Sequence, residues 1–313
     1  MKDEIYDVAM IGGGPSALSA AVYTAREDLS TVVLEKAIVG GMAAITDQID
    51  NYPGFANGVA GIELADQLQK QAERFGVKIE YTTVEGLERK GDVIAVKTDM
   101  GDITARSVLI ATGSDYSKIN VPGEAEYYGR GVHYCATCDG AFYRDKKLAV
   151  VGGGNSGVQE AIFLTRFASH IDLLVRSTIK ASSVLQKELQ KYVDEGKVSI
   201  HLGTTINEIK ATDGKVVGVD ISENGVQKDI LIDGVFIFVG LKPNTQFLAG
   251  APVELDELGL VKTDTTYHTA MPGVFASGDV RSGATMQVAS AVGEGASAAL
   301  AIRHYLEDQT RVA

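Results

Sequence analysis

Two stretches of the chain share one pattern of apolar and glycine positions. Residues 6–18, YDVAMIGGGPSAL, and residues 147–158, KLAVVGGGNSGV, each start with an apolar run, pass through three glycines and continue into small residues with helical spacing. A second apolar run follows each copy, at residues 30–34 and 170–175. This is the pattern of a strand, a tight turn, a helix and a second strand. The copies lie too far apart for a solenoid repeat, so we expect two nucleotide-binding domains.

The segments around these copies predict how the domains are connected. In chain order they indicate a helix at 61–75, strands at 77–104 and 107–114, and strands at 198–230 and 235–244. The tail holds the segment GVFASGDV at 273–280 and a helix at 287–306. The tail has no glycine fingerprint of its own, so we expect it to complete the first domain. We therefore predict an α/β fold of two Rossmann-like (three-layer ββα) nucleotide-binding domains, with the second domain, 115–245, inserted into the first, 1–114 and 246–313.

Composition excludes several classes of function. Among 313 residues, 29 are Lys or Arg and 41 are Asp or Glu, so the formal net charge is −12. That charge argues against a nucleic-acid partner and against docking on an anionic membrane. The N-terminus lacks the pattern of a secretory signal, and no apolar run is long enough to cross a bilayer. We therefore expect a cytoplasmic protein, in which thiols are normally reduced.

The first glycine segment has the spacing of a dinucleotide fingerprint, Gly12-x-Gly14-x-x-Ala17. Gly12 permits the tight turn, Gly14 lets a pyrophosphate approach the backbone, and Ala17 keeps helix and strand close. The free N–H groups of the following helix favour a phosphate group. Glu35 ends the next strand, where a carboxylate accepts hydrogen bonds from ribose hydroxyls. The sequence thus predicts a dinucleotide site here.

The second fingerprint, Gly152-x-Gly154-x-x-Gly157, differs at its acidic position. Its second strand ends at Val175-Arg176, with no carboxylate and with Lys180 shortly after. Cations there suit the 2′-phosphate of NADP rather than the free ribose of NAD. The alternative is that both are solvated surface cations.

The two cysteines of the chain form one C-x-x-C motif, Cys135-Ala-Thr-Cys138, followed by Asp139. Such a pair accepts two electrons and passes them on by thiol–disulfide exchange, and Asp139 is a candidate proton carrier. The alternative is half of a zinc site, with His133 nearby, but zinc normally takes four ligands and no second cysteine pair exists. The five histidines form no paired motif, and we expect most of them to be surface or packing residues.

The ordered motifs resemble those of the low-molecular-weight, bacterial-type thioredoxin reductases, over essentially the full chain. They are GGGPSA at 12–17, GG at 40–41, NYPGF at 51–55, ATG at 111–113, CATCDG at 135–140, GGGNSG at 152–157 and ASGDV at 276–280. CATCD within the second domain is the most specific of them. It separates this group from glutathione-reductase-like enzymes, whose cysteine pair lies in the FAD domain.

The resemblance implies a function and a set of site residues. The chain would pass electrons from NADPH, with NADH possible, through FAD to the dithiol and on to thioredoxin or a thioredoxin-like redoxin. Cys138 would face the flavin, Cys135 would attack the partner's disulfide and Asp139 would carry the proton. The implied FAD-binding residues are Gly12, Gly14, Pro15, Ser16, Ala17, Glu35, Lys36, Gly41, Met42, Asn51, Ala111, Thr112, Gly113, Gly278, Asp279, Gln287, Val288 and Ala289. Those for the nicotinamide nucleotide are Gly154, Asn155, Ser156, Arg176 and Lys180.

The resemblance also implies a homodimer and a second domain that rotates between two orientations. Three departures bear on the cofactors: the family's basic segment is reduced to Arg176 and Lys180, its GGQ ends in Met42, and its Arg-Gln before the last helix is Met286-Gln287. They leave the electron donor open between NADPH, NADH and another donor. A dithiol oxidase that passes electrons to oxygen, the flavoprotein of an alkyl hydroperoxide reductase and a nucleotide-binding redox sensor are the alternatives.

Overall fold

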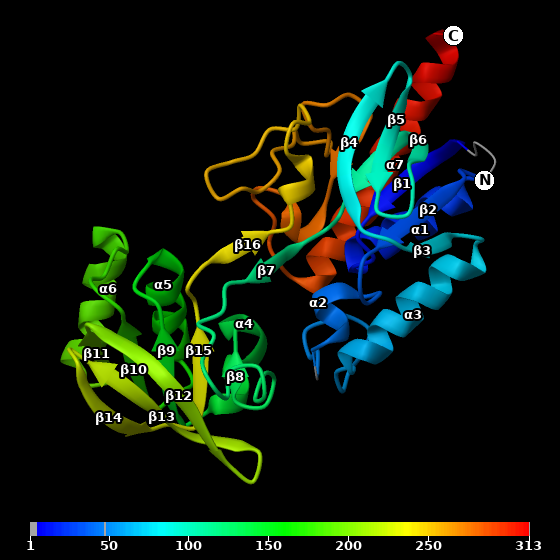
Figure 1. The fold of residues 1–313 in the computed structure, drawn as a ribbon. Helices are drawn as coiled ribbons and strands as arrows, with labels where there is room; N and C mark the ends of the chain where they lie inside the picture. Colours follow the sequence, from blue (N-terminus) through cyan, green and yellow to red (C-terminus); the bar gives the residue numbers. More distant parts are fainter. Residues whose placement is uncertain (1–4, 47, 313) are drawn as a thin grey trace. The chain divides into compact units, whose positions relative to one another are not determined.

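The computed structural model describes residues 5–46 and 48–312, and the chain divides into two compact units (Figure 1). Unit 1 contains the residues up to 115 together with those from 242 onward, and unit 2 contains residues 116–241. The chain passes between them twice, at β7 (Ser114–Tyr116) and β16 (Leu241–Pro243), which pair in a two-stranded sheet. No helix among the described residues is long and apolar enough to cross a bilayer.

Unit 1 is built on a seven-stranded sheet with the path β3-β2-β1-β6-β5-β4, and β17 pairs with β6. Its strands are β1 (Ile5–Ile11), β2 (Thr31–Glu35), β3 (Lys78–Tyr81), β4 (Val84–Lys90), β5 (Val93–Thr98), β6 (Ile103–Ile110) and β17 (Val274–Ala276). Its helices are α1 (Pro15–Arg26), α2 (Gly41–Ala44), α3 (Gly61–Arg74) and α7 (Val288–Val312). β1 runs parallel to β2 and β6, and β17 runs parallel to β6, so the carboxyl ends of these four strands meet at one edge of the sheet.

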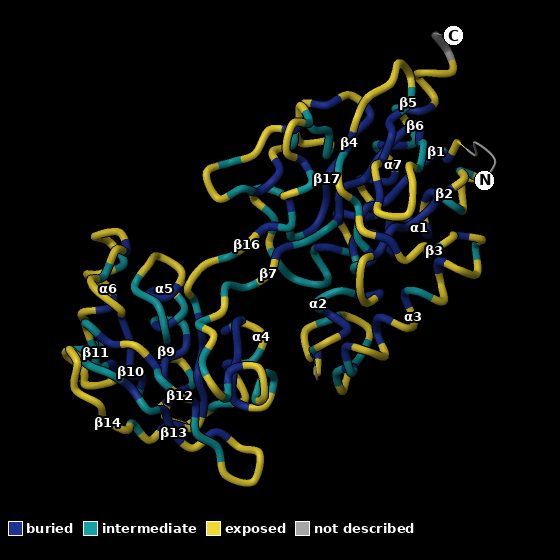
Figure 2. Tube along the Cα trace, viewed as in Figure 1, coloured by how far each residue is buried: buried dark blue, intermediate teal, exposed yellow. Residues whose placement is uncertain are grey.

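The side chains of β1 alternate between two cores on opposite faces of this sheet, as the period of a strand requires. Val8 and Met10 belong to the core that α1, α3 and α7 cover. Ala9 and Ile11 belong to a second core, which includes Leu87 of β4. Figure 2 shows these central strands as buried segments. The fold therefore holds the carboxyl edge of the sheet on a rigid, fully packed base.

Unit 2 combines a parallel sheet, β11-β10-β9-β15-β8, with an antiparallel sheet, β12-β13-β14. Its strands are β8 (Val132–His133), β9 (Lys147–Val151), β10 (His170–Val175), β11 (Val198–Leu202), β12 (Thr204–Thr212), β13 (Lys215–Glu223), β14 (Val226–Leu231) and β15 (Gly234–Ile237). Its helices are α4 (Ala136–Asp139), α5 (Asn155–Leu164) and α6 (Ser183–Asp194), and a 3-10 turn, η1, covers Gly140–Tyr143. Leu148 and Val150 of β9 pack toward α5, whereas Ala149 packs toward the antiparallel sheet.

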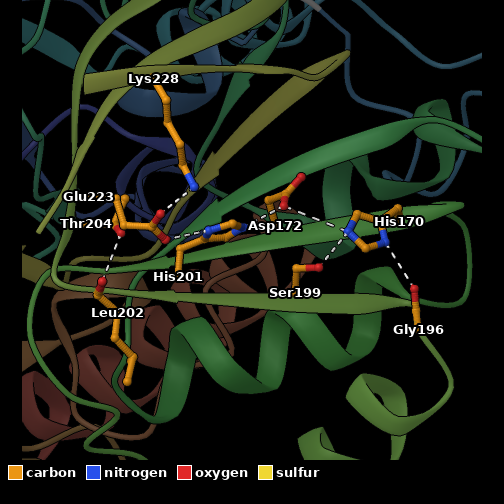
Figure 3. Close-up of polar contacts among 9 residues, drawn as sticks. All are labelled: His170, Asp172, Gly196, Ser199, His201, Leu202, Thr204, Glu223 and Lys228. Atoms are coloured by element: carbon orange, nitrogen blue, oxygen red, sulfur yellow. Dashed lines mark hydrogen bonds and ion pairs between the residues drawn. The ribbon is translucent and has the colours of Figure 1, made fainter. Parts of the chain in front are cut away.

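Polar side chains join the two sheets of unit 2 (Figure 3). The Nε2 atom of His201 lies 2.8 Å from Oδ1 of Asp172 on β10, and its Nδ1 atom lies 2.8 Å from Oε1 of Glu223 on β13. Hydrogen bonds from Lys228 and His201 lower the pKa of Glu223. The two ring nitrogens of His201 each contact a carboxylate oxygen from a different sheet. His201 is thus a polar link between β10 and β13.

The predicted fold class is confirmed, and each predicted segment contains the expected type of element. The second crossing, at residues 241–242, precedes the 245–246 boundary chosen from sequence. Asn244 explains the position, because its backbone N–H donates to Gly113 and its side chain and carbonyl bond to Thr112. Such long-range hydrogen bonds attach residues 242–245 to unit 1.

Candidate active site

The first glycine loop connects β1 to α1 at the carboxyl edge of the parallel strands. Gly12 has φ +97°, and a Cβ atom there would lie 2.5 Å from the carbonyl oxygen of Ala111, so no other residue fits. Gly14, the N-cap of α1, has an ordinary extended conformation, and a Cβ atom there would meet nothing within 4 Å. Space at Gly14 thus lies directly before the first N–H groups of α1, where a phosphate is favoured.

Glu35 supports this loop from the end of β2. One carboxylate oxygen accepts the N–H of Gly13 at 2.6 Å, and the other accepts the N–H of Ala37 at 2.8 Å. Each oxygen has two lone pairs, so both retain capacity to accept a hydroxyl. Lys36, by contrast, is exposed beside it.

Two C-terminal segments join the glycine loop, although they lie more than 250 residues away in the sequence. The hydroxyl groups of Ser16 and Ser277 are 2.7 Å apart and buried. Gly278 follows β17 with φ +72°, and its N–H donates to Glu294 of α7. Arg281 forms an ion pair with the same carboxylate at 2.6 Å. These contacts hold the start of α7 beside the start of α1.

Asp279 lies within this arrangement, and its partly buried carboxylate has no hydrogen-bond or ionic partner among the described residues. Burial, together with the charge of Glu294, raises the pKa of Asp279 from 3.8 to about 6. A carboxylate without a protein partner is available to accept hydrogen bonds from a ligand with hydroxyl or N–H donors.

Asn51 and Gln287 also come together here. The side-chain N–H of Asn51 donates to Oε1 of Gln287 at 2.9 Å. Gln287 directly precedes Val288 and Ala289, the first residues of α7. Gly41, which precedes Met42, lies near the loop as well, because a Cβ atom on Gly41 would be 3.6 Å from the Cα atom of Gly14. Several of the residues predicted for the first site, among them Gly14, Ser16, Gly41, Gly278 and Gln287, thus lie together in unit 1.

The second glycine loop repeats the geometry within unit 2. A Cβ atom on Gly152, where φ is +140°, would collide with the carbonyl oxygen of Phe238, whereas one on Gly154 would meet nothing within 4 Å. Gly154 is the N-cap of α5. The segment after β10 folds back over this loop: Lys180 N–H donates to the carbonyl of Gly153 at 2.6 Å, and Asn155 accepts from Ser182.

Lys180 is therefore held beside the second loop by its backbone, and Arg176 directly follows β10. Both residues are exposed, and neither side chain has an ionic partner among the described residues. Two unpaired cations next to a helix N-terminus that also bears Ser156 favour an anionic ligand.

The cysteine motif forms a disulfide between Cys135 and Cys138, whose Cα atoms are 5.4 Å apart. Cys135 is the N-cap of α4, and its sulfur accepts the N–H of Cys138 at 3.2 Å. Cys138 is the more exposed of the two, while Asp139 is mostly buried. Among the residues described, no group of three or more His, Cys, Asp or Glu side chains is placed to hold a metal ion.

Comparison with known proteins identifies the family. Residues 6–295 match the profile of the family described as pyridine nucleotide-disulphide oxidoreductase. The chain belongs to this family.

Relatives within the pyridine nucleotide-disulphide oxidoreductases are similar over nearly the full length. A thioredoxin reductase of Bacillus subtilis (strain 168) is 39% identical over 310 residues, which cover 98% of this chain and 96% of the relative. One of Treponema pallidum (strain Nichols) is 37% identical over 305 residues, covering 96% and 97%. The crystal structure of thioredoxin reductase from Streptococcus pyogenes MGAS5005 has a TM-score of 0.93, with 40% identity, and covers 98% of this chain and 100% of its own. The resemblance to thioredoxin reductases is thereby confirmed.

The protein is therefore an oxidoreductase, and members of its family use a flavin and a pyridine nucleotide. Its residues fit both groups. In unit 1, open space at Gly14, spare acceptor capacity on Glu35 and the unpartnered carboxylate of Asp279 suit a dinucleotide with a polyhydroxyl chain. In unit 2, open space at Gly154 and the unpaired cation of Arg176 suit a second dinucleotide.

We expect Asp279→Asn to stabilise the apoprotein at pH 8 while weakening flavin binding about tenfold. The raised pKa means that the folded protein binds more protons than the unfolded chain between about pH 4 and 6, so stability falls as the pH rises through that window. Asn removes this titration, and we expect a gain of about 1–3 kcal/mol at pH 8. Urea unfolding of the apoprotein at pH 4 and 8 measures the effect. Asp92→Asn, in the exposed turn after β4, is the matched control. The prediction would be contradicted if the free energy of unfolding changed equally with pH in the D279N variant and in the unmodified chain.

Sequence reasoning missed one group of polar contacts in unit 2. His133, expected to be a surface or packing residue, is 5% exposed and contacts both Asp139 and Tyr143. The only hint in the sequence is that His133 lies two residues before Cys135 and so close to the cysteine motif.

Proposed function

We propose that this protein is a thioredoxin reductase, which passes electrons from NADPH through FAD to Cys135 and Cys138 and then to the disulfide of thioredoxin or a thioredoxin-like redoxin. One observation carries the proposal: the Cys135–Cys138 disulfide lies at the surface of the unit that also contains the second dinucleotide loop. The names of the full-length relatives support it.

The residues proposed for FAD are those gathered at the carboxyl edge of unit 1. The first N–H groups of α1 would bind the pyrophosphate, Glu35 the adenosine ribose and Asp279 the ribityl chain. Asn51 and Gln287, which hydrogen-bond to each other, would border the flavin ring. Bound flavin supplies a two-electron carrier between the nicotinamide and the disulfide.

The dithiol would then perform two exchange steps. Two electrons break the Cys135–Cys138 bond and leave one thiolate and one thiol. The Cys135 thiolate attacks the partner's disulfide and forms a mixed disulfide, and the partner sulfur that leaves takes up a proton. Asp139 accepts the proton of Cys138, whose sulfur attacks Cys135 and restores the disulfide, and Asp139 returns this proton to the second partner sulfur as it leaves. Overall, one NADPH and one proton reduce one partner disulfide to two thiols.

Local geometry favours Cys135 as the attacking residue, although Cys138 is more exposed. The N–H of Cys138 donates to the sulfur of Cys135, and a hydrogen bond to a sulfur stabilises its thiolate. The nicotinamide site and the dithiol belong to one unit and would serve one flavin in turn, so reorientation of the units is part of the proposal, as are a homodimer and a cytoplasmic location.

Arg176 and Lys180 support NADPH over NADH. We expect the FAD-loaded protein to reduce thioredoxin with a KM for NADPH at least tenfold below that for NADH. Arg176→Ala with Lys180→Ala should raise the KM for NADPH by about 10- to 100-fold, because two charge-assisted contacts to the 2′-phosphate are lost. The KM for NADH should change less than threefold.

Steady-state oxidation of each nucleotide at 340 nm with thioredoxin measures these values. Lys187→Ala with Lys191→Ala, on exposed positions of α6, is the charge-matched control. Equal KM values for the two nucleotides would contradict the NADPH assignment. Oxygen consumption by the flavoprotein without any nucleotide, and no thioredoxin reduction, would contradict the function itself.

A further inference from the structure

Three side chains on either side of the dithiol in the sequence form a hydrogen-bonded chain. His133, the last residue of β8, has its Nδ1 atom 3.1 Å from Oδ2 of Asp139 and its Nε2 atom 2.7 Å from the hydroxyl of Tyr143. All three residues belong to unit 2. Asp139 adjoins Cys138, so the chain begins at the proposed proton carrier and leads into the core.

The His133 ring is held in place by aromatic packing. It stacks on Phe236 with ring centroids 5.0 Å apart, and Tyr143 meets the same Phe236 ring edge-on at 5.6 Å. His133 and Phe236 are also direct partners in the pairing of β8 with β15. Tyr143 packs against the bare backbone of Gly234, where a Cβ atom would be 2.5 Å from its ring. Both His133 and Tyr143 are thus packed against residues of β15.

The hydroxyl group of Tyr143 is protonated and can donate a hydrogen bond. Burial raises the pKa of its hydroxyl, and the negative charges of Asp139 and Asp233 raise it further. Asp233 precedes β15 and forms an ion pair with Lys146. A hydroxyl that stays protonated can donate to Nε2 of His133. A neutral imidazole that accepts at Nε2 carries its proton on Nδ1, and that proton points at Asp139.

We propose that His133 is a positioning residue for the proton carrier, and this rests on the role proposed for Asp139. Tyr143 sets the tautomer of His133, and the Nδ1–H of His133 donates to Oδ2 of Asp139. The carboxyl group is then held in one orientation, with Oδ1 as the oxygen that takes and returns the proton of Cys138. The proton moves between sulfur and Oδ1, and no net charge enters the buried aromatic cluster. The same hydrogen bond stabilises the carboxylate after Asp139 has given its proton away.

The tautomer is measured directly by long-range ¹H–¹⁵N NMR on protein labelled with ¹⁵N-histidine, with the His133 signals assigned by their loss in His133→Asn. We expect a neutral Nδ1–H ring in the unmodified protein and a mixture of tautomers in Tyr143→Phe. A neutral Nε2–H ring, an imidazolium at pH 7, or an unchanged ring in Tyr143→Phe would overturn the proposal. This measurement uses neither nucleotide nor thioredoxin, so its failure is distinct from a failure of the proposed function.

Function is tested through alkylation of the DTT-reduced holoprotein by iodoacetamide between pH 5 and 9. His133→Leu removes both hydrogen bonds of the imidazole. We expect the pH profile of its alkylation rate to shift by on the order of one pH unit, and its rate of thioredoxin reduction to fall about tenfold. His133→Asn places an amide N–H near the position of Nδ1 and should restore most of the turnover. His170→Asn, which loses contacts to Ser199 and Gly196 elsewhere in unit 2, is the control. An unshifted profile in folded His133→Leu would overturn the proposal. If that variant does not fold, an unshifted profile in Tyr143→Phe would do so.

Discussion

Cys135→Ser is expected to lower thioredoxin turnover at least about 1,000-fold while leaving flavin reduction by NADPH at its normal rate. The serine hydroxyl cannot form the mixed disulfide with the partner, and it is a far weaker nucleophile than a thiolate at neutral pH. Loss of a nucleophile that acts together with a neighbouring group removes nearly the whole contribution of that group. Reduction of the flavin by NADPH needs neither sulfur, so only the later half of the reaction should disappear.

Anaerobic stopped-flow absorbance of the flavin, followed by steady-state thioredoxin reduction, separates the two halves. Thr137→Ser, an exposed change between the two cysteines, is the matched control and should behave as the unmodified protein. Retained thioredoxin turnover in the Cys135→Ser variant would exclude the dithiol mechanism. Loss of both halves together would show that Cys135 supports the flavin site rather than the exchange.

Gly14→Val is expected to give a folded protein that binds FAD at least about 100-fold more weakly. The backbone of Gly14 suits any residue, with φ −76° and ψ 178°, and a Cβ atom meets no protein atom within 4 Å. The added methyl groups would instead occupy the space in front of the N–H groups of α1, where the pyrophosphate is proposed to lie. At Gly12, by contrast, any side chain would collide with Ala111 and damage the fold itself.

Gly154→Val provides the reciprocal control, because Gly154 has the same extended conformation and the same open space in unit 2. We expect each variant to lose its own dinucleotide and keep the other. Flavin content after gel filtration, NADPH binding by calorimetry and thermal unfolding measure the three quantities. Normal flavin content in the Gly14→Val variant would contradict the site. An unfolded apoprotein would show that the open space at Gly14 is needed by the chain rather than by a ligand.

Local chemistry explains why much of the candidate site was predictable. The tight turns at Gly12 and Gly152 require positive φ, and few residues other than glycine adopt it, so the requirement is written directly in the sequence. Cys135 and Cys138 are close enough to bond simply because only two residues lie between them at the start of a short helix. The positions that no pattern could connect are Asn51 with Gln287 and Ser16 with Ser277. Their contacts exist only because β17 and α7 return to the sheet that β1 began.

The sequence by itself determined two nucleotide loops, a redox pair of cysteines and the order in which the domains follow one another. Each of these is a matter of short-range geometry, in which a few neighbouring residues set the backbone. Only the tertiary structure decided which distant side chains share an edge, and which buried groups lack or share a partner. Folding raises the pKa of Asp279 by partial burial beside Glu294, and it gives His133 two partners, Asp139 and Tyr143. Burial and long-range pairing change what a side chain can do, and neither is present until the chain has folded.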